Sequence, residues 1–355
     1  MIAQDARWVA DALLSTQSAG DASGVLPFAL MGHSARIVYE GSVAIRSSNI
    51  DNGLPELAEL LEDRYAGVVA RARHAGKFLD DSKKAFQDLL GEMGEFLDLH
   101  HAEFSGNAVW FGRRFETDLG LFCVPSGRIV ASTIPVQFRA GVQRTVKLSD
   151  LGQLLFEIAE EQGRVLLVLA SADGDSTPPG PTVGYAPLGR VAPKDRKAVK
   201  YLADRYDPAF PTETKLLLLM VEGEVNTTDL VLPLTEPGHE EAVFRGRTVS
   251  LFHSLGAVKE ILSAYPSAEA VATNTMRSLI DEQPTRRLLE DDGIRKVRNR
   301  CMHYEIRDST LSLVPELPMF GIVESLYPGR TFDDLNEDVR AMASRLGETM
   351  NDWKT

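Results

Sequence analysis

Apolar residues in the first hundred positions recur at spacings of three and four, which is the period of an amphipathic helix. The turns between these stripes contain glycine, serine and asparagine, which favour connections over regular structure. The pattern therefore predicts an all-helical region over residues 1–106. Its expected helices are 6–14, 27–45, 57–72 and 86–97.

The pattern changes after Gly106 to short runs of β-branched and aromatic residues, which are typical of strands. We expect strands at 109–111, 119–124 and 129–134, the last two joined as a hairpin through Pro125-Ser126-Gly127. Two segments further on, Val165–Ala170 and Lys215–Val221, are apolar at every position except Lys215 and are interpreted as buried strands.

Helical segments are expected between these strands. Ser149 is a suitable cap for a helix that ends near Glu161, and residues 194–206 show a second helical pattern. Between them, 171–189 is rich in glycine and proline and is expected to be a loop. Residues 107–246 are therefore predicted to form a mixed α/β region.

Helical periodicity returns at Thr248 and continues to the end of the chain. The final helix has the clearest pattern, and Thr331 followed three residues later by Asp334 resembles a capping box at its start. The whole chain is predicted to be a multidomain α+β protein with boundaries at 1–106, 107–246 and 247–355. Four helices are expected in the last region, over 248–262, 268–282, 292–305 and 332–353.

Composition limits the classes of function. The chain has 38 basic and 51 acidic residues, a net charge of −13, which disfavours bulk DNA binding and requires a local basic patch for any contact with nucleic acid. Only two cysteines are present, which favours a cytoplasmic location, and no apolar run is long enough to span a membrane. The acidic and histidine residues form no complete ligand set, so we expect neither a metal nor a cofactor.

The segment from Arg295 to Tyr304 supplies the basic patch. On a helix, Ile294, Val297, Cys301 and Tyr304 would face the core, while Asn299 and His303, four residues apart, would project from the opposite face. Arg298 would lie at the border between the two faces. A cationic helix face of this kind is also common as a simple solvated surface.

The sequence Arg298-Asn299-Arg300-Cys301-Met302-His303 resembles the motif of the HEPN superfamily (higher eukaryotes and prokaryotes nucleotide-binding), an arginine and a polar residue followed after three positions by histidine. The resemblance covers about 248–353. It implies a four-helix bundle, a homodimer and, in many members, metal-independent cleavage of RNA at a composite site. The pair Arg247 and His253 has the looser arginine-histidine spacing and is expected to be a chance match before the first helix of this region.

The chemistry of these residues agrees with that implication. RNA carries its own nucleophile, so a histidine that moves a proton and an arginine that stabilises the phosphate can cleave it. Arg298, Asn299 and His303 are the candidate catalytic residues, and Arg295, Lys296 and Arg300 are expected to bind flanking phosphates. We therefore expect an endoribonuclease with RNA as its partner. By analogy with the family alone, the resemblance implies a role in stress or phage defence. Two alternatives are a non-catalytic HEPN-like protein that binds a nucleotide or another protein, and an unrelated helical adaptor.

Overall fold

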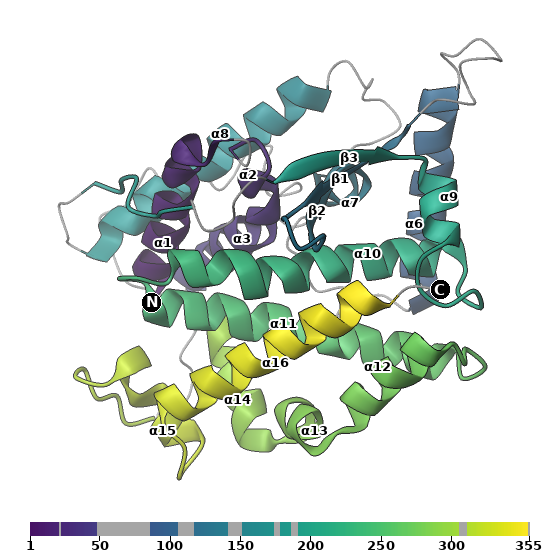
Figure 1. Ribbon diagram of the computed structural model, residues 1–355. Helices are drawn as coiled ribbons and strands as arrows, with labels where there is room; N and C mark the ends of the chain where they lie inside the picture. The colour runs from purple at the N-terminus through teal and green to yellow at the C-terminus, as the bar shows by residue number, and fades with distance from the viewer. Residues whose placement is uncertain are drawn as a thin grey trace.

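The computed structural model describes residues 1–20, 23–47, 86–105, 117–140, 151–173, 178–185, 191–304 and 311–353. These residues form a mostly helical protein with one three-stranded antiparallel sheet, an α+β architecture (Figure 1). No helix in these ranges is long and apolar enough to cross a membrane.

The helices expected near the N-terminus are confirmed where the structure describes them. The segment predicted as one helix over 27–45 forms two, and the helix expected over 57–72 lies outside the described residues, as does the strand expected at 109–111. The elements of the first half are α1 (Ile2–Ser15), η1 (Thr16–Ser18), α2 (Leu26–Ala29), α3 (Met31–Ser47), α6 (Phe86–Ser105), α7 (Thr133–Ala140), α8 (Leu151–Ala170) and η5 (Ser171–Asp173).

The sheet has the strand order β2-β1-β3, with both pairs antiparallel. Its strands are β1 (Leu119–Cys123), β2 (Ile129–Ser132) and β3 (Ala192–Arg196). The expected hairpin is confirmed, but its second strand ends at Ser132 and not at Ile134, because α7 begins at Thr133. Gly127 in its turn has a φ of +88° that favours glycine. The helix expected over 194–206 is wrong in its first part, because residues there pair with β1 as an exposed edge strand. Only α9 (Ala198–Ala203) is helical.

The strand expected at Lys215–Val221 is wrong, because this run lies in the helix α10 (Thr212–Asn226). The helix packs against β2 and α6 as well as against α11 and α16, so it is surrounded by other elements. The six residues from Leu216 to Val221 are each at most 2 % exposed. A helix that is buried on all sides has no polar face, so its sequence lacks the three-and-four spacing of apolar residues that identifies an amphipathic helix.

The strand expected at Val165–Ala170 is wrong for a related reason, because α8 continues to Ala170. Within this last turn, Val165, Leu166 and Leu169 are buried while Leu167 is 48 % exposed. That alternation is helical, but leucine on the exposed face gives the run a uniformly apolar sequence.

The C-terminal half contains the four expected helices together with additional short ones. Its first long helix begins at Glu240 and not at Thr248, and the capping box of Thr331 and Asp334 at the start of α16 is confirmed. The elements here are α10, η7 (Thr227–Val231), η8 (Leu232–Thr235), α11 (Glu240–Ala264), α12 (Val271–Asp281), α13 (Gln283–Glu290), α14 (Asp292–Met302), η9 (Pro318–Gly321), α15 (Ile322–Leu326) and α16 (Phe332–Asp352).

The long helices α10 and α11 lie side by side at the centre of the molecule (Figure 1). The sheet covers α10 on one side, and α16 crosses both helices on the other. The main apolar cluster includes Met93, Leu218 and Val297, which come from all three predicted regions. The boundary expected after residue 246 falls inside α11, which is continuous there.

Candidate functional site

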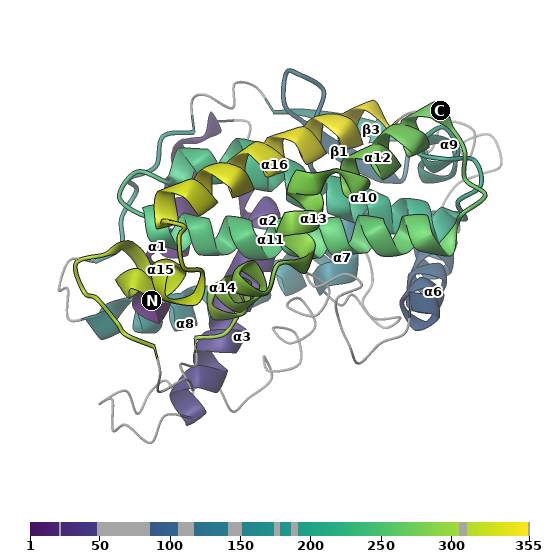
Figure 2. The same cartoon turned by 90° about the horizontal axis from the view of Figure 1, so that it is seen from below.

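The segment that carries the candidate motif forms α14. Asp291 caps the helix, since its carboxylate accepts from the backbone N–H groups of Gly293 and Ile294. Ile294, Val297 and Cys301 are at most 1 % exposed, which confirms this part of the expected core-facing stripe. Tyr304, the fourth expected member, is buried but lies beyond the end of the helix. Figure 2 shows α14 next to α11 and close to α3.

His303 lies just beyond the C-terminal end of α14. Its backbone is extended, with φ −114° and ψ 125°, and its N–H donates to the carbonyl of Asn299 at 2.9 Å. The expectation that His303 and Asn299 share one helix face is therefore wrong, because the helix ends at Met302. The departure of the backbone from the helix directs the imidazole toward α3.

The imidazole of His303 contacts a carboxylate that lies 263 positions away in the sequence. Its Nδ1 is 2.8 Å from Oε2 of Glu40 on α3. The Glu40 side chain is 4 % exposed, whereas that of His303 is 48 % exposed. A carboxylate beside Nδ1 favours a proton on that nitrogen, which leaves Nε2 as the nitrogen that can accept a proton. Sequence reasoning did not identify Glu40, because nothing along the chain connects it with the motif.

The same face of α3 fixes the backbone at the end of α14. Arg36, one turn before Glu40, donates from Nη1 to the carbonyl of Cys301 at 2.9 Å. Carbonyls in the last turn of a helix have no partner within the helix, so this bond satisfies one of them. Arg36 thus holds the backbone carbonyl of Cys301, and Glu40 holds the imidazole of His303.

A buried network anchors Tyr304, the residue that follows His303. Its hydroxyl donates to Oδ2 of Asp5 at 2.6 Å, and the other oxygen of Asp5 accepts from Nε of Arg245 at 2.8 Å. Arg36 Nη2 also contacts Oδ2 of Asp5, at 3.1 Å. Burial would raise the pKa of Asp5, but the charges of Arg245 and Arg36 outweigh it and lower the pKa below its usual value. The carboxylate therefore stays charged and holds the end of the motif against α1.

Arg298 and Asn299 form a second pair on α14. The Nε and Nη2 atoms of Arg298 donate to Oδ1 of Asn299 at 3.3 and 3.1 Å. The guanidinium carbon lies 5.5 Å from the ring centroid of Phe252 on α11, a cation–π distance. The structure thus brings Arg298 together with Asn299 and brings His303 together with Glu40.

The remaining candidate cations are also on α14. Arg295 and Lys296 are exposed, and both form ion pairs with Asp292, the Lys296 ammonium at 2.8 Å. Arg300 is half-buried in the last turn of the helix. Exposed pairs of this kind are weak, so a phosphate can compete with Asp292 for these cations.

The residues of the looser match, Arg247 and His253, are structural. Arg247 does not precede the first helix of the region, as the sequence suggested, because it lies within α11. It is 1 % exposed and donates to Asn336 at 2.9 Å and to Glu236 at 3.3 Å. His253 is 3 % exposed. Substituting either residue would perturb the core, so neither position is suitable as a control variant that should leave RNA cleavage unchanged.

The described residues contain no group of three histidine, cysteine or acidic residues that could hold a metal ion. Both cysteines are free and buried. Burial raises the pKa of Cys301 to about 12 and also raises that of Cys123, so both thiols stay protonated at neutral pH.

The fold and this site define a helical α+β protein with a solvent-accessible histidine that is positioned by a buried carboxylate at the end of a cationic helix. Comparison of the chain with protein-family models, with curated proteins and with solved structures gave no match.

Proposed function

We propose that this protein is a metal-independent endoribonuclease whose reaction takes place at the end of α14. The observation that carries the proposal is the 2.8 Å contact between His303 Nδ1 and the buried Glu40, with the imidazole itself half exposed. A histidine held in this way can exchange a proton through Nε2. The cations of α14 and the resemblance of Arg298 to His303 to the HEPN motif support RNA as the substrate.

In the proposed reaction, Nε2 of His303 takes the proton of a ribose 2′-hydroxyl. The freed oxygen attacks the adjacent phosphorus, and the bond to the 5′-oxygen breaks, which leaves a 2′,3′-cyclic phosphate on one product and a 5′-hydroxyl on the other. Arg298 stabilises the additional negative charge on the phosphate in the transition state. Activity on RNA also fits the cytoplasmic location that the two cysteines favour.

Cleavage of a mixed single-stranded RNA by the purified chain is expected to continue in excess EDTA, because His303 and Arg298 need no metal. Products should carry 2′,3′-cyclic phosphate ends, and an RNA with a 2′-deoxyribose at the cleaved position should remain intact. Gel analysis with end-group assignment measures all three properties. Activity that is lost in EDTA and restored by Mg²⁺ or Mn²⁺ would refute the mechanism, and binding of RNA without cleavage would favour the non-catalytic alternative.

The leaving 5′-oxygen needs a proton, which we propose comes from His303 of a second copy of the chain. We therefore expect a homodimer through the C-terminal helices, as the HEPN resemblance implies. Light scattering at micromolar concentration should give twice the monomer mass of 39.0 kDa. A strict monomer that still cleaves RNA would show that one copy contains the complete site.

A further inference from the structure

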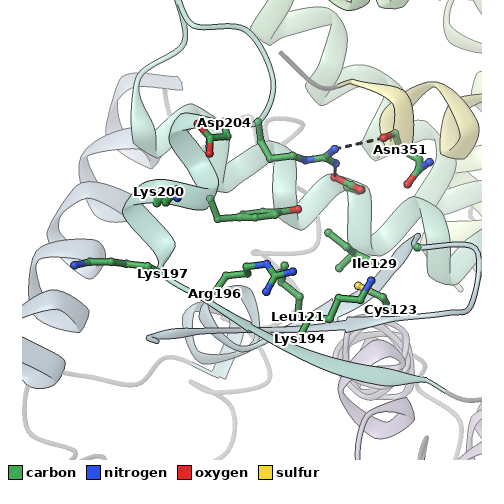
Figure 3. Close-up of a pocket in the computed structure, with 13 residues that line it drawn as sticks. Leu121, Cys123, Ile129, Lys194, Arg196, Lys197, Lys200, Asp204 and Asn351 are labelled. Carbon is green, nitrogen blue, oxygen red and sulfur yellow. Dashed lines mark hydrogen bonds and ion pairs between the residues drawn. The ribbon is translucent and has the colours of Figure 1, made fainter. Parts of the chain in front are cut away.

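A cavity lies between the sheet and the helices α9 and α10, well separated in sequence from the motif (Figure 3). Its volume is about 700 Å³, which is within the range of small-molecule sites. All three strands contribute side chains to its lining, and Asn351 at the end of α16 closes one side. The cavity is thus large enough for a ligand of nucleotide size.

Four cations line the cavity within seven positions of the sequence. They are Lys194, Arg196, Lys197 and Lys200, and all four are exposed. Figure 3 shows Lys194 and Arg196 on β3 and Lys197 and Lys200 at the start of and within α9. In the described part of the chain, no carboxylate forms an ion pair with Lys194 or Lys200. In a chain of net charge −13, this concentration of positive charge favours an anionic ligand.

A buried carboxylate with one unused oxygen also lines the cavity. Glu222 on α10 is 1 % exposed, and its Oε2 pairs with Arg205 and accepts from the hydroxyl of Tyr206 at 2.7 Å. Its Oε1 is buried and has no hydrogen-bond partner among the described residues, and the same holds for Nε of Arg205. A buried acceptor without a partner is unfavourable, so a ligand that donates a hydrogen bond to Oε1 would be stabilised there.

Between the four cations and Glu222, the wall of the cavity is apolar. Leu121 and Ile129 come from the sheet, and Tyr201 presents its ring from α9. Such surfaces suit a flat, largely apolar group. The ligand must therefore combine a strongly anionic group, a flat ring system and a hydrogen-bond donor.

We propose that this cavity binds a nucleoside phosphate, with Lys194 and Lys200 at the phosphates, Tyr201 against the base and Glu222 Oε1 accepting from an N–H group of the base. Each part of the nucleotide then meets a different feature of the cavity. The proposal does not depend on the ribonuclease activity, because no residue of the α14 site lines this cavity.

Isothermal titration of the full chain with GTP and with ATP tests the proposal. One of the two is expected to bind with a dissociation constant below 100 µM. Tripolyphosphate and the free nucleoside should each bind at least tenfold more weakly, since each provides only part of the complementary chemistry. The double variant Lys194→Ala/Lys200→Ala should weaken nucleotide binding at least tenfold. Both positions are exposed, so this variant is expected to fold.

The matched control is Lys259→Ala/Arg286→Ala, which removes the same charge from exposed ion pairs on α11 and α13 and should bind like the wild type. The proposal is overturned if neither nucleotide binds at 1 mM, or if the Lys194→Ala/Lys200→Ala variant binds as tightly as the control. Equal affinity for tripolyphosphate and for the nucleotide would also overturn it, because the base would then contribute nothing.

Discussion

His303→Ala is expected to lower the rate of RNA cleavage by about 10²- to 10⁴-fold, because it removes the group that takes the 2′-hydroxyl proton. The imidazole is half exposed but also contacts the buried Glu40, so the melting temperature is measured alongside the rate, and cleavage is compared well below it. Arg298→Ala should also reduce the rate strongly, since it removes the charge that stabilises the transition state. Single-turnover cleavage of one labelled RNA measures both effects.

Two residues elsewhere, one partly exposed and one exposed, provide matched controls. His101 is another partly exposed histidine beside a carboxylate, with Nδ1 3.4 Å from Asp118, and Arg286 is an exposed arginine on α13. His101→Ala and Arg286→Ala should therefore cleave RNA at the wild-type rate. If the His303 and Arg298 variants retain full activity, the site is wrong even if the protein is a ribonuclease.

Glu40 is a positioning residue, because its carboxylate contacts Nδ1 of His303 at 2.8 Å and so fixes the orientation of the imidazole. Glu40→Ala should lower kcat for RNA cleavage with little change in KM, because RNA is still bound but Nε2 is no longer held in place. Glu40→Gln should recover part of kcat, since its amide oxygen can still accept from the Nδ1–H group. A purely structural role would lower kcat only as far as the folded fraction falls.

Asp5→Ala is expected to lower the free energy of unfolding by about 3–5 kcal/mol, which is the usual cost of removing one partner from a buried ion pair. The variant would remove the carboxylate that the buried guanidinium groups of Arg36 and Arg245 share, and with it the hydrogen bond that the Tyr304 hydroxyl donates. Urea unfolding measures this loss of free energy, and the slope of the free energy against urea concentration should be unchanged. Because the backbone of the motif ends in this network, the positioning of His303 should also become less well defined.

The control for this prediction is Glu160→Ala on α8, whose carboxylate forms an exposed pair with Arg164 one turn away. It should cost no more than about 0.5 kcal/mol. A loss below about 1 kcal/mol for Asp5→Ala would contradict the assigned role of the network.

The low pKa of Asp5 adds a test with pH. Its contribution to stability should be complete above the ordinary value of 3.8 and should be lost as the pH falls below it.

The sequence by itself determined the elements whose polar and apolar faces differ. The three-and-four spacing located α6, α14 and α16, the residues Thr331 and Asp334 marked the start of the last helix, and Gly127 marked the hairpin turn. One side of each of these helices faces solvent and the other faces the core, so polar and apolar residues alternate along the sequence with the helical period.

Only the tertiary structure decided the elements and contacts that depend on distant neighbours. The run Leu216–Val221 is apolar throughout because helices and sheet enclose it, and a strand buried on both faces would have the same sequence. Glu40 meets His303 across 263 positions, and Glu222 is brought to a cavity with Lys194 from another element. Local periodicity reports which face of an element is buried, whereas the identity of the residue on the other side of a contact is set by how the elements pack.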